Sequence, residues 1–273
     1  MNSKCISCGR KIKLFEENSG IKIYRCPKCG LGVTEHTKEK DQYAAYHRDP
    51  VYLRESAQFR NIFEKRVNII SKFKNVGKAL EIGSSTGLLL LLLKERGWEI
   101  MGIDPSRSSV SEARRREIPT LNTTFEQANL GQLKFDVIIF NHVFEHMANP
   151  LEVLKKANKL LKKGGIVFFD VPNFASLSAR ISGAAWRYIL PKEHRWHFTP
   201  TALFMLLEKA RFTPVYWEAH SGVWGYDNPI RELWESLRGG KKRFVWNILT
   251  LMPTWFLTQF KSGTGLSVVA QKL

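Results

Sequence analysis

The sequence predicts an α/β protein: a parallel sheet covered by helices on both faces, preceded by a small ribbon at the N-terminus. Two observations predict this fold class. From Lys78 onward, short apolar runs alternate with segments of helical periodicity, which is the pattern of a doubly wound sheet. All four cysteines lie within the first 29 of the 273 residues, which sets that short segment apart from the rest of the chain.

The cysteines form two pairs, each with two residues between its members and with 17 residues between the pairs. Two thiolates at this spacing on a turn can share one tetrahedral ion, so the two pairs together predict a closed, structural zinc site. The alternative, two disulfide bonds, fits poorly with a chain that shows no export signal. Residues 11–17 and 21–26 alternate in polarity like short strands between the pairs. The predicted zinc ligands are Cys5, Cys8, Cys26 and Cys29.

Length and charge limit the class of protein. A chain of 273 residues that is 44% hydrophobic can bury one large core and carry a small accessory. Lysine and arginine number 42 against 25 acidic residues, so the formal net charge of +17 would attract nucleic acid, anionic lipid or a phosphorylated substrate. Residues 1–10 lack the apolar run of a signal peptide, and we expect a cytoplasmic protein, with a peripheral position on the inner face of the membrane as the alternative.

We expect three parts along the chain. Residues 1–34 form the zinc ribbon, residues 35–75 form a helical connector, and residues 76–273 form the main domain, with an insertion at about 222–262. In the connector, apolar residues recur at spacings of three and four, which predicts a long helix that ends near Phe73.

We expect four strands in the main domain, each followed by a helix. The expected strands are residues 78–82, 99–103, 135–140 and 166–171, and the expected helices are residues 86–96, 108–116, 150–161 and 199–210. Asn149 before Pro150, and Thr199 before Pro200, are typical of helix starts. The leucine block 88–93 is apolar all round and therefore predicts a buried helix.

The first strand of this series runs into a loop of small residues, EIGSSTG, at positions 81–87. The second strand ends at Asp104, 21 residues after Gly83, a distance at which an acid binds ribose hydroxyls in Rossmann-like folds. Glu81 would repel a pyrophosphate and attract a cationic sulfonium, by roughly a few kcal/mol at partly buried distances. The loop and its acids therefore favour S-adenosylmethionine over a dinucleotide.

At this point the sequence resembles a known family. The motifs are ALEIGSSTG, GIDPS, FDVIIFNHVFEHMANP, LLKKGGIVFFDVPN, HRWHFTP and GLSVVAQK. In order and spacing they resemble class I S-adenosylmethionine-dependent methyltransferases, and more narrowly the small-molecule and glycan-modifying branch in which a zinc ribbon precedes the catalytic domain. The resemblance covers nearly the whole chain. It implies a Rossmann-like, seven-stranded sheet whose last strand, residues 266–271, is antiparallel to the others.

The resemblance also implies roles in cofactor binding. The loop would line the methionine end, Asp104 would hold the ribose, and Thr124 and Phe125 would flank the adenine; a helix-capping role is the alternative for Asp104. Ser85 stands where the family has glycine, and we expect a negative φ there, which serine tolerates. Asn141 would close the edge of the fourth strand. The predicted cofactor-binding residues are Glu81, Gly83, Ser84, Ser85, Gly87, Asp104, Thr124, Phe125 and Asn141.

Methyl transfer to a hydroxyl requires a group that accepts the proton. His142, Glu145 and His146 stand at i, i+3 and i+4, which predicts that they share one helical face. Ubiquinone-pathway O-methyltransferases are similar here, which implies a divalent ion at these three residues; the alternative is that Glu145 and His146 brace the helix start. His146 and His194 are the preferred bases, because histidine titrates near neutrality. The predicted catalytic residues are His146, His194 and Glu145.

The segment 241–261 carries no charge between residues 244 and 260, and it contains two tryptophans and Pro253. Three cations, at residues 241–243, precede the uncharged stretch, so the segment could lie in the interface of a bilayer. The alternatives are a lid over the substrate and a surface that pairs two copies.

These observations predict an S-adenosylmethionine-dependent methyltransferase (EC 2.1.1.-) that acts on a hydroxyl of a small-molecule, glycan-like or lipid-linked acceptor. Two other functions stay open: an RNA methyltransferase that uses the basic surface and the ribbon, and a noncatalytic binding protein with the same fold. Nucleic acid is the less favoured partner. Methylation of a pyrimidine at carbon 5 by the cysteine-adduct route needs a nucleophilic thiol, but every cysteine here is assigned to zinc. The chain also lacks the Asn/Asp-Pro-Pro-aromatic turn of enzymes that methylate base amines.

Overall fold

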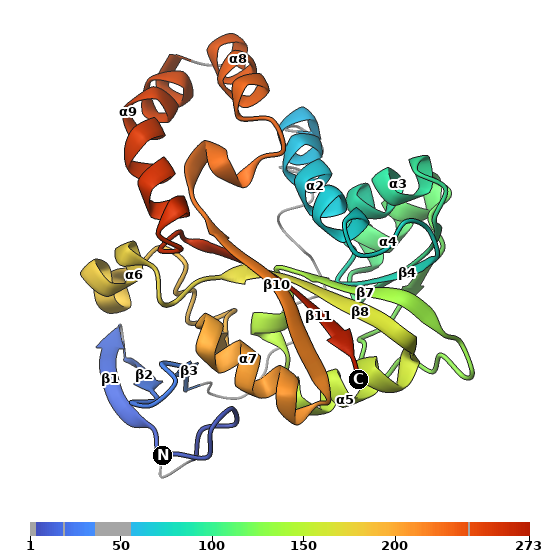
Figure 1. Ribbon diagram of the computed structural model, residues 1–273, viewed down its shortest axis with the longest axis horizontal. Coiled ribbons are helices and arrows are strands. Elements are labelled where there is room, and N and C mark those ends of the chain that lie inside the picture. The colour runs from blue at the N-terminus through green and yellow to red at the C-terminus, as the bar shows by residue number, and fades with distance from the viewer. Residues whose placement is uncertain (1–3, 19, 36–55, 240) are drawn as a thin grey trace.

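The computed structural model describes residues 4–18, 20–35, 56–239 and 241–273, and a seven-stranded sheet lies at its centre (Figure 1). The strand order is β10-β11-β8-β7-β4-β5-β6. β11 is antiparallel to both of its neighbours, and the other pairs are parallel. The prediction of seven strands with the last one antiparallel is therefore confirmed. The strands are β4 (Lys78–Ile82), β5 (Glu99–Asp104), β6 (Thr120–Asn122), β7 (Phe135–Asn141), β8 (Leu161–Pro172), β10 (Phe212–His220) and β11 (Gly265–Lys272).

The strand order reverses between β4 and β7. From β4 the chain moves outward through β5 and β6, and it then returns to the other side of β4 for β7 and β8. Loops that leave two neighbouring parallel strands in opposite directions open a crevice at the carboxyl edge, where doubly wound sheets bind their ligands. The topology thus fixes where a site must lie before any side chain is considered.

Helices cover both faces of the sheet, as the apolar strands require (Figure 1). One face packs against α2 (Ser56–Ser71), α3 (Leu88–Glu95) and α4 (Arg107–Arg115), and the other packs against α5 (Pro150–Leu160) and α7 (Pro200–Lys209). Five of the six leucines in block 88–93 are buried, so the predicted buried helix is confirmed. The first part of the predicted connector, residues 36–55, lies outside the described residues.

The predicted helix starts are also confirmed. Asn149 Oδ1 accepts a hydrogen bond from the Glu152 N–H, and Thr199 Oγ1 accepts one from the Ala202 N–H at 3.1 Å. In both helices proline takes the first turn, where its missing N–H has no partner to lose. These helix starts could be predicted from the sequence because each capping hydrogen bond joins residues within four positions of one another.

The N-terminal ribbon is joined to the main domain by strand pairing. Its strands β1 (Lys13–Asn18), β2 (Ile21–Arg25) and β3 (Gly32–Thr34) form an antiparallel sheet with a fourth strand, β9 (Trp196–His197). Gly32 permits this approach, since a Cβ there would lie 2.9 Å from the Cβ of His197. The Thr34 hydroxyl adds a bond of 2.8 Å to the same imidazole. A segment about 160 residues further along the chain therefore completes the ribbon.

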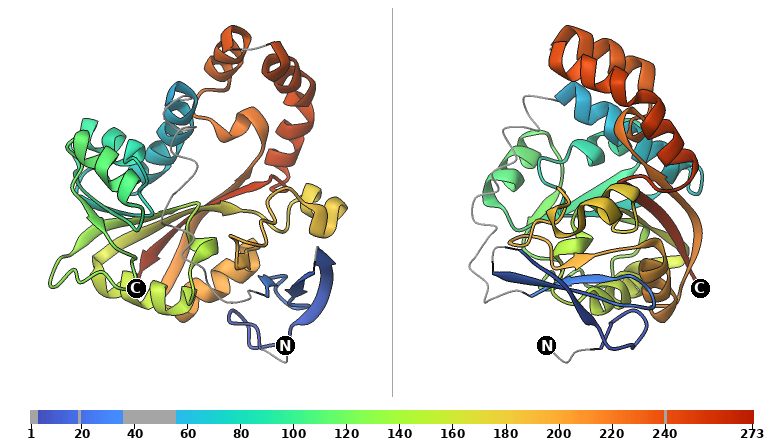
Figure 2. Two further views of the ribbon diagram at one scale, coloured as in Figure 1. Left: turned by 180° about the vertical axis from the view of Figure 1, so that it is seen from behind. Right: turned by 90° about the vertical axis from the view of Figure 1, so that its left-hand side faces the viewer.

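The segment before the last strand, where the sequence predicts an insertion, forms a helical hairpin. The chain leaves β10 through a short 3-10 turn, η3 (Gly222–Gly225), and then forms α8 (Pro229–Gly239) and α9 (Lys241–Gln259) before entering β11. A smaller excursion after β8 contains α6 (Leu177–Ser182) and the 3-10 turn η2 (Gly183–Ala185). Figure 2 shows that the hairpin and the ribbon lie at opposite ends of the molecule.

Candidate active site

The loop between β4 and α3 lies at the carboxyl edge of the sheet, next to the point where the strand order reverses. Gly83 and Gly87 both have positive φ, 67° and 77°, which glycine adopts without steric cost. A Cβ would also collide with a neighbour at each position: Val143 Cγ2 at 2.7 Å from Gly83 and Ile118 Cδ1 at 2.4 Å from Gly87. Both glycines are therefore required by conformation and by space, as the motif indicates.

Ser85 adopts a positive φ of 46°, so the expectation of a negative φ is wrong. The conformation costs a serine of the order of 1–2 kcal/mol. One compensation is visible: the Ser85 N–H donates a hydrogen bond of 2.8 Å to Asp104 Oδ2. The family's glycine at this position reflects a real backbone demand, and this chain meets it with a strained serine held by an acid.

Asp104 connects two loops at the carboxyl edge. Its Oδ2 accepts the Ser85 N–H, and its Oδ1 accepts the Ser106 N–H at 2.8 Å. The side chain is 7% exposed. Ser106 itself caps α4. The acid therefore organises the loops, and a carboxylate oxygen that accepts one bond still has capacity for another. Its contact with a ribose stays a prediction.

Of the buried oxygen atoms near this edge that have no hydrogen-bond partner among the described residues, three belong to predicted cofactor-binding residues. They belong to Glu81, Ser84 and Asn141, and Glu81 is only 2% exposed. Burial, and then the nearby charge of Asp104, raises the pKa of Glu81 well above its ordinary value of 4.5. Buried acceptors without donors are costly. A cationic ligand rich in donors would satisfy them, so the residues fit S-adenosylmethionine.

Thr124 and Phe125 follow β6 in a short turn. The Thr124 hydroxyl accepts the Gln127 N–H at 3.3 Å. The Phe125 ring is 1% exposed and packs edge-on against Phe140, with the Lys156 Nζ 5.0 Å from its centroid. The ring is thus part of the core, and the predicted contact of these two residues with adenine stays a prediction.

The residues after β7 do not share a helical face, and that prediction is wrong. β7 ends at Asn141, His142 turns the chain with a positive φ of 52°, and a 3-10 turn, η1 (Phe144–His146), follows. Glu145 points inward and is 1% exposed, whereas the His142 side chain is 45% exposed. His142 Nδ1 nevertheless lies 3.6 Å from Glu145 Oε1. The backbone turn, not a helix, brings these groups together.

His194 joins this cluster from a distant loop. Ligand atoms of Glu145, His146 and His194 all lie within 4.8 Å of one another. His146 Nδ1 contacts the Glu193 carbonyl at 2.8 Å, and His194 Nδ1 contacts the Tyr188 carbonyl at 2.9 Å. A carbonyl accepts only, so in the neutral rings Nδ1 carries the hydrogen and each Nε2 offers a lone pair. The structure thus gathers three acceptors, and His142 is not a member of this triplet.

The charges of the cluster follow from burial and proximity. Burial lowers the pKa of His194 to about 4, which keeps this imidazole neutral near pH 7. Burial alone would raise the pKa of Glu145, but the His142 contact and the other imidazoles lower it to about 2. Both Glu145 oxygens lack a hydrogen bond within the described part of the chain. A buried carboxylate close to the neutral His194 imidazole is suited to hold a cation.

One candidate functional residue was not predicted from the sequence. Asp170, near the end of β8, is fully buried and forms an ion pair with Arg66 of α2. Its other oxygen lies 3.6 Å from His220 Nε2. Burial opposes ionisation, but the guanidinium and then His220 lower the pKa of Asp170. The signal in the sequence was an acid within the apolar run IVFFDV; its partners come from two other elements.

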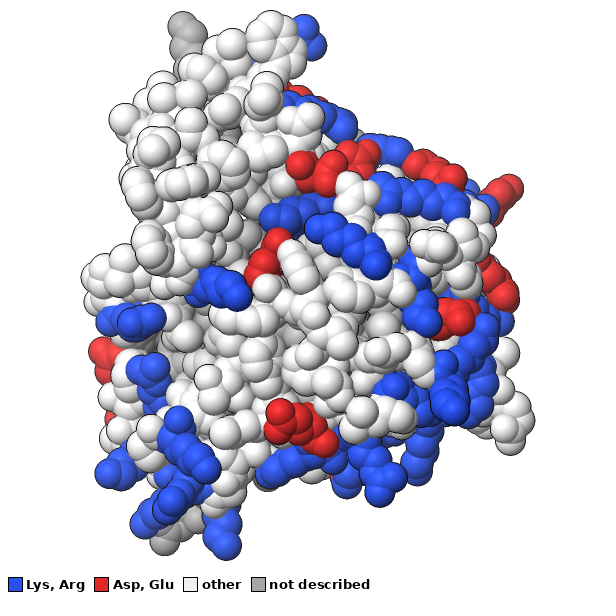
Figure 3. Space-filling model, in the orientation of Figure 1, with Lys and Arg blue, Asp and Glu red and all other residues white. Residues whose placement is uncertain are grey.

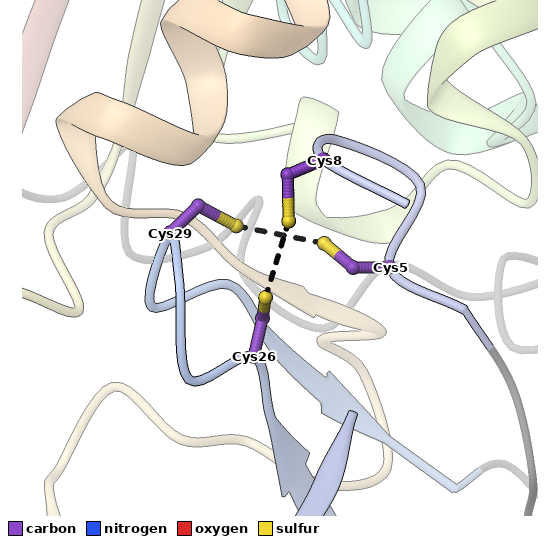
Figure 4. A group of neighbouring side chains, drawn as sticks. All are labelled: Cys5, Cys8, Cys26 and Cys29. Atoms are coloured by element: carbon purple, nitrogen blue, oxygen red, sulfur yellow. Dashed lines mark hydrogen bonds between the residues drawn. The ribbon is translucent and has the colours of Figure 1, made fainter. Parts of the chain in front are cut away.

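The four cysteines converge at the tip of the ribbon (Figure 4). The Sγ atoms of Cys5 and Cys29 are 3.5 Å apart, and those of Cys8 and Cys26 are 3.3 Å apart. These distances are far beyond a disulfide bond, and all four thiols are free. Zn–S bonds of 2.3 Å in a tetrahedron imply S–S distances of about 3.8 Å. The cluster therefore could hold zinc.

The chain belongs to a methyltransferase family. Residues 54–216, more than half of the chain, match the family model described as a methyltransferase domain. Together with the seven-stranded sheet and the glycine loop, this match identifies the protein as a class I S-adenosylmethionine-dependent methyltransferase.

Curated relatives narrow the comparison. The chain is 32% identical to a ubiquinone biosynthesis O-methyltransferase of Cereibacter sphaeroides over 150 residues, which cover 50% of this chain and 61% of that protein. A protein of the same name from Ruegeria is 31% identical over 172 residues, covering 59% of this chain and 69% of that protein. The chain thus spans about three fifths of the length of the first of these relatives.

Solved structures agree on the fold. An S-adenosylmethionine-dependent methyltransferase from Archaeoglobus fulgidus has a TM-score of 0.56 at 20% identity, covering 81% of this chain and 99% of that one. A 1,6-didemethyltoxoflavin-N1-methyltransferase from Burkholderia thailandensis has a TM-score of 0.54 at 14% identity, covering 95% of this chain and 99% of that one. At these identities the likeness shows the shared fold alone.

Proposed function

We propose that this methyltransferase transfers the methyl group of S-adenosylmethionine to a hydroxyl of a small-molecule or glycan-like acceptor, including one linked to a lipid. The C–S bond of the sulfonium breaks as a C–O bond forms, the sulfonium becomes a neutral thioether, and the hydroxyl proton passes to the protein or solvent. The observation that carries the proposal is the set of buried oxygen atoms at the ends of β4 and β7 that have no hydrogen-bond partner in the described part of the chain. The O-methyltransferases among the relatives support oxygen as the methylated atom.

Different residues at this edge would contact different parts of the cofactor. Gly83, Ser84 and Gly87 would lie along its methionine end, and Ser85 would hold Asp104 in place for the ribose. Asn141 would receive a donor at the edge of β7, where its Oδ1 is buried without a partner in the described chain. Thr124 would border the adenine. These roles are proposed from position, since each residue lies at the carboxyl edge of the sheet.

Glu81 should make cofactor binding depend on pH and on ligand charge. A bound cation lowers the raised pKa of this acid, so binding should release a proton, and affinity should fall as the pH drops through that raised pKa. Glu81→Gln should weaken S-adenosylmethionine about tenfold more than it weakens S-adenosylhomocysteine, which lacks the sulfonium charge (about 1.4 kcal/mol). Calorimetry of both ligands in buffers of different ionisation enthalpy measures this. Glu99→Gln, at an exposed surface acid, is the control; equal losses for both ligands would contradict the role.

We further propose that Glu145, His146 and His194 hold a divalent ion beside the acceptor. Three potential ligands converge, and both Glu145 oxygens lack a hydrogen bond among the described residues. The two Nδ1 contacts to carbonyls fix both rings as metal-ligating histidines are fixed. A bound divalent ion would lower the pKa of the acceptor hydroxyl. The same three groups are the predicted catalytic residues, and His146, the more accessible of the two histidines, is the proposed proton acceptor when no ion is bound. The exposed His142 would border the acceptor instead of ligating.

Glu145→Gln should abolish tight Mn²⁺ binding, because the carboxylate supplies the only negative charge of the triplet. Electron paramagnetic resonance of the purified protein, titrated with Mn²⁺, should show about one bound ion per chain in the parent and a loss of at least tenfold in affinity in the variant. Glu152→Gln, on the exposed side of α5, is the matched control. Unchanged Mn²⁺ binding in Glu145→Gln would rule out this site.

We also propose that the cysteine cluster holds a structural zinc ion and that residues 1–34 form the zinc ribbon in front of the catalytic domain. Gly9 and Gly30 support it: each follows a cysteine pair with a φ of 74° and bonds back to the first cysteine of its pair. Four thiolates close the coordination sphere, so the ion would have no open position for catalysis.

Metal analysis should therefore find about one zinc ion per purified chain. Cys26→Ser should lose it and should lower the midpoint of thermal unfolding, because a ribbon of this size depends on its metal. Lys28→Ala, at an exposed position of the same turn, should keep both zinc and stability. Retention of full zinc occupancy by Cys26→Ser would contradict the four-cysteine site.

The reaction itself can be tested with methyl-labelled cofactor and a cell extract that is then separated into polar metabolites, lipids and RNA. We expect label in the metabolite or lipid fraction, and about tenfold less label with a Glu81→Gln protein at limiting cofactor. Label confined to RNA would favour the RNA methyltransferase alternative. Complete absence of turnover, with cofactor binding intact, would favour a binding protein that has kept the fold.

A further inference from the structure

The hairpin formed by α8 and α9 carries most of the apolar side chains that the described chain exposes. The described chain has seventeen exposed large hydrophobic residues, and ten of them lie between positions 230 and 260. Their exposed fractions range from 46% to 78%. We refer to these ten as the hairpin surface. They are Ile230, Trp234, Leu237, Val245, Trp246, Ile248, Leu249, Met252, Phe256 and Phe260.

Both helices of the hairpin direct polar side chains towards the rest of the protein. In α8 the polar residues Glu232 and Ser236 are buried, at 1% and 0% exposure. Glu232 accepts hydrogen bonds from Arg243, at 2.6 and 2.7 Å, and from Asn247 at 3.2 Å. Further along α9, the Thr258 hydroxyl accepts the Ser221 N–H. The polar sides of the helices thus face the protein, which leaves their apolar sides to the outside.

The outward side of α9 is a continuous stripe. Its exposed members Val245, Leu249, Met252, Phe256 and Phe260 follow one another at spacings of four, three, four and four, which places them on one face of a helix. In a water-facing helix this face would be polar. An apolar stripe of this length marks a surface that another phase or molecule covers.

The segment that carries the stripe has charges of one sign. Figure 3 shows an almost uncharged surface over α8 and α9, with both basic and acidic side chains along its margin. The exposed cations nearest in sequence are Arg238, Lys242 and Lys261. Residues 241–261 contain no acid. Glu232 is already bonded to Arg243, and Glu235 of α8 is paired with an arginine of its own helix.

We propose that the hairpin surface docks on the interface of an anionic lipid bilayer, with its apolar stripe among the upper acyl chains and its cations at the headgroups. Exposed Trp234 and Trp246 suit that depth, because indole rings favour the boundary between lipid and water. No helix in the described ranges combines the length and hydropathy needed to cross a bilayer, so the hairpin lies in the interface. A second copy of the chain fits less well, since a symmetric contact would bring the two sets of cations together.

The hairpin is attached directly to the candidate active site. At its base, Lys65 of α2 donates to the Trp224 carbonyl at 2.6 Å, and Arg66 donates to the Gly225 carbonyl while pairing with Asp170 of β8. Docking would therefore hold the carboxyl edge of the sheet close to the membrane surface. On the proposed function, to which this consequence alone is tied, a lipid-linked acceptor would be delivered there; membrane binding itself does not depend on that function.

Sedimentation with vesicles tests the docking surface. We expect the full-length chain to bind vesicles that contain phosphatidylglycerol more tightly than vesicles of phosphatidylcholine alone. Trp246→Gln/Leu249→Gln/Met252→Gln should reduce partitioning at least tenfold. Leu14→Gln/Val76→Gln/Leu133→Gln, three exposed apolar residues elsewhere on the molecule, should leave it unchanged. Circular dichroism and cofactor binding should be unchanged in both variants, which separates this test from the proposed function.

Two further measurements sharpen the outcome. Acyl chains carrying bromine should quench tryptophan fluorescence of the parent chain, and binding should persist in part at high salt, because apolar insertion is not screened. Binding that vanishes completely at high salt without quenching would overturn insertion. So would equal binding by the two triple variants. A parent chain that ignores vesicles and forms a dimer dissociated by the hairpin variant would assign the surface to a second copy.

Discussion

The pairing of β3 with β9 is the contact on which the geometry of the candidate site depends. It joins the cysteine ribbon to the segment that carries His194, and the Arg195 N–H in that segment donates to the Glu145 carbonyl at 3.0 Å. The ribbon is therefore a support for the acidic and imidazole cluster. Thr199 strengthens the same connection through a bond of 2.6 Å from its hydroxyl to the Cys29 carbonyl.

Electrostatics at the carboxyl edge follow from burial. Glu81 and Glu145 are both almost inaccessible, yet their pKa values move in opposite directions. Glu81 has another acid nearby, so burial dominates, whereas Glu145 is surrounded by imidazoles whose favourable interaction exceeds the desolvation cost. The chain thus places one carboxylate where a ligand must supply the positive charge and another where the protein supplies part of it. Such divergence between two acids is a feature of functional sites.

Local signals in the sequence were reliable where a structure is determined within a few residues. The strand ends, the proline-marked helix starts, the buried leucine helix and the cysteine knuckles were all predictable on that ground. Ser85 was mispredicted because its strained φ is stabilised by the bond from its N–H to Asp104, which lies 19 residues away. The turn after β7 was mispredicted because the i, i+3, i+4 spacing of His142, Glu145 and His146 is equally compatible with a 3-10 turn that begins at a left-handed residue.

The sequence by itself determined the class of fold, the cysteine cluster and the loop with its two acids, because apolar periodicity, ligand spacing and glycine placement act over short distances. Only the tertiary structure decided which groups meet: His194 with Glu145, Asp170 with Arg66, and the ribbon with β9. It also decided that α9 turns its polar side inward, since that orientation depends on partners such as Glu232 in another helix. Contacts between residues distant in the chain depend on the topology of the sheet, which one-dimensional patterns leave open.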